Sequence, residues 1–226
     1  MTDGSGSVAV AETPDIALPA TGSTVGIDVG IARFLTTSNG EIVANPRFLK
    51  NASDELAHLQ RRYAESGRRS KQLRRAIRKL HAKITNQRLD FHHQTARRLV
   101  NQHDVIVLED LNVRAMSQRA KVKPDPNNPD VFLPNGQAAK SGLNKSISDV
   151  GWSQFRTILN LKAASAGRRV EFVNPAYTSI LCSHCAKRCT RPEQSTVICP
   201  THGPIDADLN GAINILGRGL ASSDAA

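Results

Sequence analysis

The sequence predicts a mixed α/β fold, in which helices cover a sheet of short strands, with a small metal-binding module near the C-terminus. Two observations carry this prediction. Short runs of β-branched and aliphatic residues alternate with longer segments in which apolar residues recur every three or four positions, and these patterns are typical of buried strands and amphipathic helices. Four cysteines also lie close together, between residues 182 and 199, which indicates a metal site in a chain without a secretion signal.

The composition is that of one compact domain with a small appendage. Of the 226 residues, 39% are hydrophobic and only 4% aromatic, so the core must rest on aliphatic side chains. Residues 1–22 are rich in Gly, Ser, Ala and Pro and are expected to form a disordered leader. They lack the pattern of a signal peptide, and no apolar run approaches the roughly 18 residues of a membrane span. We therefore expect a cytoplasmic protein without membrane contact.

The first three strands are expected from residue 23 onward. Residues 23–30 are apolar and β-branched apart from one carboxylate, Asp28. Residues 32–37 predict a second strand, the Ser-Asn-Gly at 38–40 predicts a turn, and residues 41–43 would return antiparallel. The result is a meander with an acid near the middle of its first strand.

Residues 52–100 are expected to form basic helices arranged as a hairpin. A first helix begins near Ser53, Glu-Ser-Gly at 65–67 breaks it, and a second follows with an inward apolar seam. A third helical stretch is expected near residues 91–100, where His92 and His93 would face solvent or phosphate. Residues 61–98 hold 13 Lys and Arg against two acidic residues, a balance of +11 in a chain whose net charge is +10.

This concentration of charge predicts a nucleic-acid-binding surface. The outward positions of the second helix carry five cationic side chains, namely Arg74, Arg75, Arg78, Lys79 and Lys83. Such a stripe suits a phosphate backbone but carries no sequence-reading information. The alternative is an ordinary solvated helix face.

The remaining elements follow from the same patterns: a strand at 104–108, a helix from about 148 to 163, a strand at 169–173 and a final helix at 208–216 ended by Gly217. Trp152 and Phe155 are expected in the core. Residues 117–142 lack periodicity and are rich in Pro, Asn and Gly, which predicts a flexible loop. Residues 218–226 are expected to be a disordered tail.

Three carboxylates are candidates for a catalytic metal site. Asp28 lies inside one apolar strand and Glu109 directly follows another, and a buried carboxylate must be paired or metal-bound. Asp206 and Asp208 open the final helix, whose dipole favours an anion there. Acids that converge from two strands and a helix start form a hard-oxygen site suited to Mg²⁺ or Mn²⁺, and two such ions can cleave phosphodiesters. Spacing alone leaves open that each acid is an ordinary turn, edge or helix-start residue.

The cysteines predict a structural zinc site within a ribbon at residues 178–205. The chain has a CxxC and a CxxH pair separated by 13 residues, and their members are Cys182, Cys185, Cys199 and His202. This spacing is typical of a Cys₃His zinc site, whereas a redox CxxC would need no second pair. Cys189 and His184 are the rival donors for the position that we assign to His202. A closed zinc site would contribute to folding rather than catalysis.

Taken together, these residues resemble the C-terminal part of the TnpB (OrfB) proteins of insertion sequences and of related compact RNA-guided nucleases. The matching segments appear in family order: GIDVG at 26–30, VLEDLNV at 107–113, LNKSISDVGWSQF at 143–155, NPAYTS at 174–179, CSHC at 182–185 and DADLNGAINIL at 206–216. The resemblance implies an RNase H-like (RuvC) domain over residues 23–217, with Asp28, Glu109 and Asp208 as catalytic acids and Asp206 supporting or incidental. The family's zinc ribbon maps onto the two ligand pairs, with His202 where a fourth cysteine is usual.

The resemblance also implies partners and a place of action. Family members use a guide RNA to find a DNA target and cut it at the RuvC site, so DNA and guide RNA are the expected partners and the nucleoid the expected location. Full-length relatives carry a substantial segment before the first strand, where this sequence has about 22 residues, so we expect an N-terminally truncated nuclease core. Two other functions remain open, a non-catalytic nucleic-acid-binding remnant and a DNA transposase that joins strands as well as cutting them.

Overall fold

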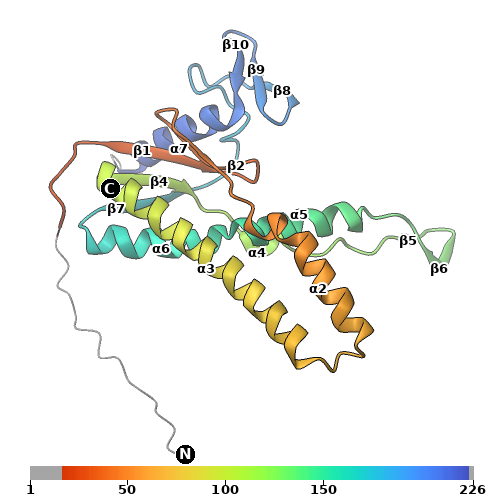
Figure 1. Cartoon of the computed structure of the whole chain (residues 1–226). Helices are drawn as coiled ribbons and strands as arrows, with labels where there is room; N and C mark the ends of the chain where they lie inside the picture. The colour runs from red at the N-terminus through yellow and green to blue at the C-terminus, as the bar shows by residue number, and fades with distance from the viewer. Residues whose placement is uncertain (1–16, 224–226) are drawn as a thin grey trace, which may run out of the picture.

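The computed structural model describes residues 17–223 and is built on a central mixed sheet (Figure 1). Five of the strands in this range form the sheet, in the order β3-β2-β1-β4-β7. Their bounds are β1 Thr24–Val29, β2 Arg33–Thr37, β3 Ile42–Ala44, β4 Val105–Glu109 and β7 Arg169–Val173. The predicted meander is confirmed, because β1, β2 and β3 pair antiparallel, while β4 and β7 add parallel to β1.

The turn of the meander forms because Gly40 has a φ of 88°, a backbone conformation that glycine adopts at little cost. Its N–H donates to the carbonyl of Thr37 at 2.9 Å. The strands on either side of this turn, β2 and β3, are thereby held in a register that pairs Thr36 with Ile42.

The two faces of the sheet are covered by different helices. The helices are α1 Phe48–Asn51, α2 Ser53–Glu65, α3 Lys71–Gln102, α4 Val113–Met116, α5 Gln137–Val150, α6 Trp152–Ser165 and α7 Ala207–Ser223. Figure 1 shows α3 and α6 on one side of the sheet and α7 on the other. Val25 and Ile27 of β1 join α3 and α6 in the main apolar core, together with Trp152 and Phe155. The prediction for these two aromatic residues is therefore confirmed.

The basic segment forms a hairpin of two helices, α2 and α3, but the third helical stretch predicted near 91–100 is not separate. It is the end of α3, a single helix of 32 residues. No glycine or proline interrupts residues 71–102, and the hydroxyl of Ser70 caps the start by accepting from the N–H of Leu73. The N-terminal half of α3 therefore pairs with α2, while its C-terminal half covers the sheet.

His92 lies in that C-terminal half, and the prediction that it faces solvent or phosphate is wrong. Its side chain is fully buried, stacked on Phe34 with ring centroids 5.4 Å apart. Nε2 lies 3.0 Å from the carbonyl oxygen of Val150. Burial lowers the pKa of His92 to about 4, so the ring is a neutral core residue at pH 7. His93, in contrast, is exposed as expected.

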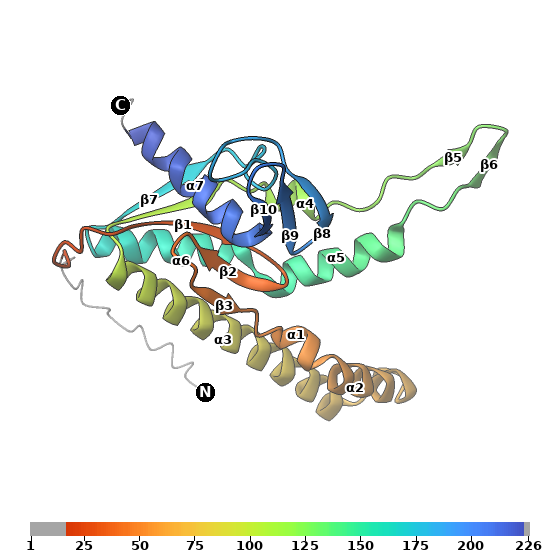
Figure 2. The ribbon, with the colours of Figure 1, turned by 90° about the horizontal axis from the view of Figure 1, so that it is seen from above.

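Residues 117–142 contain regular secondary structure where the sequence predicted a flexible loop. They contain a hairpin of β5 Pro124–Asp125 and β6 Asn128–Phe132, which projects away from the body of the protein (Figure 2). The helix predicted from residue 148 begins earlier, because α5 starts at Gln137. Gly151, with a φ of 69°, then separates α5 from α6.

Both ends of the described chain differ from the predicted disordered segments. Residues 1–16 and 224–226 lie outside the described residues, but 17–22 are bound to the core. The Leu18 N–H donates to the Ala166 carbonyl at 3.0 Å, and the Gly22 N–H donates to the Asp104 carboxylate at 2.7 Å. At the other end α7 continues through Gly217 to Ser223, because a glycine inside a packed helix weakens it without ending it.

A second, smaller sheet completes the described fold. Within residues 17–223, three short strands form it in the order β10-β9-β8, with bounds β8 Thr190–Glu193, β9 Thr196–Cys199 and β10 Gly203–Asp206. It corresponds to the predicted ribbon and leads directly into α7. In the same range, none of the helices is both long and apolar enough to cross a lipid bilayer.

Candidate active site and metal centre

Asp28 and Glu109 lie side by side because of the register of two parallel strands. Ile27 of β1 is level with Leu108 of β4, so the next residue of each strand is an acid at the carboxyl end of the sheet. Side chains alternate between the faces of a strand, and Ile27 and Leu108 both belong to the core beneath α3 and α6. The two carboxylates therefore point to the opposite face, which α7 covers.

Close packing of α7 on β1 brings the third acid to the same place. A Cβ on Gly26 would lie 2.3 Å from the carbonyl oxygen of Ala212, so the helix and strand backbones touch only because this residue has no side chain. Near the start of the helix, a Cβ on Gly211 would lie 3.1 Å from Oδ2 of Asp28. The start of α7, with Asp208 in its first turn, is thus held against the end of β1.

Asp28, Glu109 and Asp208 line one pocket of about 290 Å³, which we call the acid pocket. It lies between the ends of β1 and β4, the start of α7 and the ribbon. Its lining residues are Asp28, Val29, Gly30, Ile31, Glu109, Trp152, Pro175, Thr178, Ser179, Arg191, Gln194, Asp208 and Gly211.

Burial raises the pKa of all three acids of the pocket. Burial, together with the nearby charges of Glu109 and Asp208, raises the pKa of Asp28 to about 8. Burial also raises the pKa of Glu109, against an opposing hydrogen bond from Thr178. The pKa of Asp208 is raised by burial in the same way, with Arg33 opposing. A group of carboxylates that favours its protonated forms is one that a bound cation would stabilise.

Asp206 has a different role from Asp208. It caps α7, because its Oδ1 accepts from the N–H groups of Asp208 and Leu209 at 3.0 Å each. Its other oxygen pairs with Nη1 of Arg33 at 2.8 Å. Burial works to raise the pKa of Asp206, but the Leu209 N–H and Arg33 outweigh it and lower that pKa. Asp206 is fully engaged outside the acid pocket, whereas Asp208 lines it, with Arg33 3.4 Å away.

Two residues of the acid pocket were not predicted from the sequence. The hydroxyl of Thr178, 2% exposed, donates to Oε1 of Glu109. Arg191 comes from β8 of the ribbon, and its charge works to lower the pKa of both Asp28 and Asp208. Thr178 lies in the matching segment NPAYTS, to which the sequence assigned no role, and Arg191 has no local signal, because each becomes relevant only through its proximity to residues far away along the chain.

The ribbon is joined to the acid pocket through two asparagines of α7. Asn210 is fully buried; its amide donates to the Leu181 carbonyl and its oxygen accepts from the Ser183 N–H, both at 2.8 Å. One turn later, the amide of Asn214 donates to the carbonyls of Thr178 and Leu181 at 2.8 and 2.7 Å. The backbone that carries Thr178 is therefore held by α7 and leads directly into the first cysteine pair.

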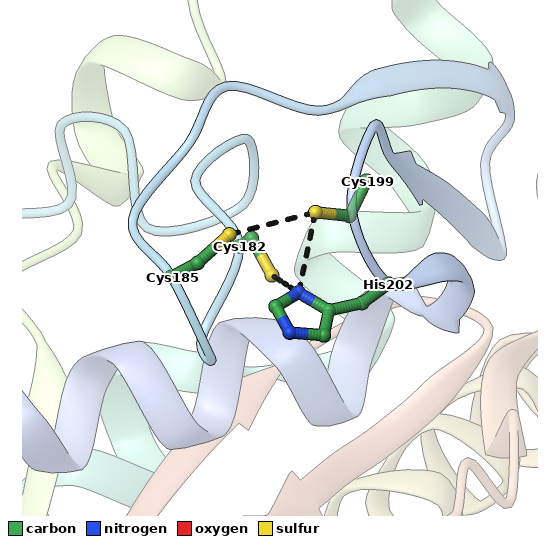
Figure 3. Close-up of side chains that lie close together, drawn as sticks. All are labelled: Cys182, Cys185, Cys199 and His202. Atoms are coloured by element: carbon green, nitrogen blue, oxygen red, sulfur yellow. Dashed lines mark hydrogen bonds between the residues drawn. The ribbon is translucent and has the colours of Figure 1, made fainter.

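The two predicted ligand pairs converge (Figure 3). The Sγ atoms of Cys182 and Cys199 each lie 3.5 Å from Nδ1 of His202, and Cys185 Sγ lies 3.6 Å from Cys199 Sγ. All four ligand atoms lie within 4.8 Å of one another. Burial works to raise the pKa of Cys199, but the N–H groups of Thr201 and His202 lower it to about 6, which favours the thiolate that binds metals. Three sulfurs and one imidazole nitrogen match the donor chemistry of Zn²⁺.

The rival donors are outside this group. Cys189 is 7% exposed, and burial raises its pKa to about 11, but its sulfur is not among the four ligand atoms that converge. The His184 ring lies beside the His202 ring, with centroids 5.1 Å apart, but His184 is not among the four residues that converge.

The five predicted nucleic-acid-binding residues are all exposed on the N-terminal half of α3. They are Arg74, Arg75, Arg78, Lys79 and Lys83. They do not line the acid pocket. The apolar seam of the same helix ends in buried Leu80 and Ile84, so the charged face is the one turned to solvent.

Comparisons with known proteins agree with this architecture. A family model described as a probable transposase, OrfB_IS605, matches residues 7–120, and the model of the TNB domain of Cas12f1-like proteins matches residues 152–215. The chain is 35% identical over 214 residues to a putative RNA-guided DNA endonuclease of Streptomyces pristinaespiralis. It is 36% identical over 206 residues to the putative RNA-guided DNA endonuclease InsQ of Escherichia coli strain K12.

These alignments cover 91% and 88% of this chain but 47% and 50% of the two relatives. The chain thus spans about half the length of the curated relatives it matches. A chain from a cryo-EM structure of the Cas12f1-sgRNA-target DNA complex is similar in fold, with a TM-score of 0.58 at 17% identity, over 90% of this chain and 52% of that one.

The first family match runs through Asp28 and Glu109 and extends over half of the chain. The second contains both Cys/His pairs and Asp208. The chain therefore belongs to the OrfB (TnpB) family of probable transposases.

Proposed function

We propose that this chain is the nuclease core of a TnpB-like protein, with an RNase H-like (RuvC) fold, and that it cleaves DNA phosphodiester bonds at the acid pocket. The observation that carries the proposal is that three carboxylates from separate elements line one pocket at the carboxyl ends of parallel strands. Binding sites in open α/β sheets lie at these strand ends. The names of the two curated relatives, which describe RNA-guided DNA endonucleases, support the same activity.

The residues of the acid pocket fit Mg²⁺ or Mn²⁺. Asp28, Glu109 and Asp208 offer hard carboxylate oxygens, and the raised pKa of Asp28 reflects its burial beside other carboxylates. When bound, two such ions would activate a water and stabilise the oxygen that leaves the phosphate. In this scheme Asp28 and Glu109 would bind the ions from the sheet, and Asp208 would bind them from α7. Arg191 would supply positive charge for an entering phosphate.

The Cys₃His group would bind a structural Zn²⁺. Its four ligands come from two turns of the ribbon, which has few apolar residues of its own. Because so small a core would stabilise the ribbon only weakly, the bound ion would contribute much of its folding energy. The ribbon in turn holds Thr178 and Arg191 at the acid pocket.

DNA and a guide RNA are the proposed partners. The solved structure that is similar in fold is described as a complex of Cas12f1 with sgRNA and target DNA, and the exposed cationic face of α3 would suit a phosphate backbone. We extend the proposal to RNA-guided recognition of a target only for a protein that has the full length of the relatives.

The test is Mg²⁺-dependent cleavage of a labelled single-stranded DNA by the purified, zinc-loaded chain. We expect Asp28→Ala to abolish cleavage while circular dichroism and zinc content stay unchanged. Asp54→Asn, which removes an exposed carboxylate from α2 outside the pocket, is the matched control and should cleave like the parent.

Each other outcome selects a different function. Tight, salt-sensitive binding without Mg²⁺-dependent nicking would identify a non-catalytic nucleic-acid-binding protein. Joined products in the same assay would identify strand transfer. Cleavage that persists in Asp28→Ala would reject the acid pocket as its source.

A further inference from the structure

A second, more apolar pocket opens beside the acid pocket. Its volume is about 260 Å³, and it lies at the carboxyl ends of β1, β4 and β7, against the first turns of α6. We call it the apolar pocket. Val29, Glu109 and Trp152 line both pockets, so the two adjoin at the ends of β1 and β4.

The walls of the apolar pocket are aromatic and aliphatic. Trp152, Phe155 and Phe172 contribute rings, and Leu111 and Val113 contribute aliphatic side chains after β4. A volume below the roughly 300–1,000 Å³ of sites for drug-sized ligands suits a single ring system. The walls would exclude an isolated phosphate but would accept a flat aromatic group.

The cationic side chain of Arg156 lines the apolar pocket. The guanidinium of Arg156 lies over the Phe172 ring, 3.7 Å from its centroid, and pairs with Asp110 at 2.5 Å. Two fixed partners hold Arg156 in place and leave further N–H groups for a ligand. The hydroxyl of Thr157 lines the pocket nearby and donates to the carbonyl of Ser153 at 3.1 Å.

We propose that the apolar pocket is a nucleobase subsite, which takes the base of a nucleotide next to the phosphate bound in the acid pocket. The inference rests on the proposed function, because it takes from it that the acid pocket binds a phosphate of the DNA strand. A strand that enters the acid pocket must place its neighbouring base nearby, and the adjoining apolar pocket is lined by aromatic rings where the acid pocket is lined by carboxylates. Stacking tolerates any base, because every base has a π-face, so the subsite orients the strand rather than reading its sequence.

Trp152 supplies a direct reporter, because it is the only tryptophan of the protein. Its side chain is 7% exposed and lines the apolar pocket. A base stacked in the pocket would change its fluorescence, whether or not the strand is cleaved.

The experiment titrates the zinc-loaded chain, with Ca²⁺ in place of Mg²⁺, with two single-stranded DNA probes of equal length. One is an oligothymidylate, and the other has the same phosphates but abasic nucleotides. We expect the oligothymidylate to quench Trp152 fluorescence and to bind roughly tenfold more tightly than the abasic probe, which stays bound by charge alone.

A filled pocket separates the subsite from the acid pocket. Thr157 lines only the apolar pocket of these two, so Thr157→Phe should weaken oligothymidylate binding roughly tenfold and remove most of the quenching, without changing the affinity for the abasic probe. Thr157→Leu is a milder replacement should the ring prevent folding. Asn160→Phe, exposed on the same helix and outside the pocket, is the matched control and should leave both affinities unchanged.

Equal affinity and equal quenching with the two probes would overturn the inference, as would a Thr157→Phe variant that loses affinity for both probes alike. These outcomes are independent of catalysis. Base-dependent quenching in a chain that never cleaves would support the subsite while the nuclease proposal fails. Cleavage without base-dependent quenching would support the nuclease proposal and overturn the subsite.

Discussion

At the scale of single residues, Thr178 connects the ribbon with the acid pocket. Its hydroxyl donates to Glu109, and its carbonyl accepts from Asn214 of α7. The hydrogen bond from Thr178 also works to lower the pKa of Glu109, against the larger effect of burial. In the proposed nuclease Thr178 would be a positioning residue, which acts through Glu109.

We expect Thr178→Val to weaken Mn²⁺ binding about 10- to 100-fold, the equivalent of the roughly 1.5–3 kcal/mol of a hydrogen bond to a charged group. The pH at which Mn²⁺ binds should rise, because Glu109 without this donor keeps its proton to a higher pH. Titration calorimetry at several pH values measures both effects. Thr178→Ser retains the hydroxyl and should restore them; failure of Ser to do so would assign Thr178 to packing alone.

Asp28 predicts a pH dependence of stability with a definite sign. Its pKa of about 8 lies above the ordinary value of 3.8, so the folded chain holds a proton that the unfolded chain has released between about pH 4 and 8. The metal-free protein should therefore lose stability as pH rises through this range, by at most about 1.4 kcal/mol for each pH unit.

Asp28→Asn removes this titrating group, so its free energy of unfolding should exceed that of the parent at about pH 8.5 and approach it near pH 4. Urea unfolding without divalent metals other than the bound zinc measures the difference. A parent and variant whose stabilities change in parallel with pH would contradict the raised pKa. Added Mg²⁺ at the higher pH should stabilise the parent more than the variant.

At the scale of elements, α7 decides where the acid pocket forms. The helix contacts β1 through Gly26 and Gly211, and near its C-terminal end it contacts β4, where a Cβ on Gly219 would lie 2.6 Å from a methyl group of fully buried Val107. A valine cannot turn aside easily, because its branched side chain has few allowed rotamers. The close approach therefore depends on glycine.

Two glycines of α7 form a matched pair for testing this packing. Gly219→Ala should destabilise the protein by about 1–3 kcal/mol through overpacking. Gly217→Ala, whose Cβ would meet nothing within 4 Å, should be neutral or stabilising by up to about 1 kcal/mol, because alanine favours helix. Thermal unfolding measures both, and equal effects in the two variants would show that α7 does not pack on β4 as described.

At the scale of the whole molecule, the cationic stripe and the acid pocket lie apart. The acid pocket lies at the carboxyl ends of the sheet strands, while the five cationic residues of the stripe lie on the hairpin formed by α2 and α3. A long nucleic acid could reach both surfaces at once, so the stripe would contribute affinity without taking part in cleavage.

Replacing Arg74, Arg75 and Arg78 with Gln should lower the affinity for duplex DNA and reduce the slope of log K against log salt by roughly 1 for each phosphate that is no longer neutralised. Fluorescence anisotropy between roughly 50 and 200 mM salt measures the slope. The triple Arg→Lys variant keeps the charge and should keep the slope. An unchanged slope in the Gln variant would identify the stripe as an ordinary solvated face.

Local patterns predicted much of the fold. The order of strands and helices, the break at 65–67 and the turn at Gly40 follow from periodicity and from backbone preferences, which act over a few residues. The same holds for the convergence of Cys182, Cys185, Cys199 and His202, because two short turns bring each pair of ligands together. Residues 117–142 were less predictable, because the pairing of two very short strands depends on a hairpin with little local signal.

The sequence by itself determined which groups are available: three acids at the ends of core elements, four zinc-type donors and a cationic helix face. Only the tertiary structure decided how they are used. The β1–β4 register places Asp28 beside Glu109, and the close backbone approach at Gly26 brings Asp208 to them. Long-range hydrogen bonds and ion pairs engage Asp206 with Arg33 and Thr178 with Glu109. Burial turned His92 from an expected surface residue into a neutral core residue. The physical reason is the same in each case, since these roles arise from interactions between residues far apart in the chain, which no local pattern encodes.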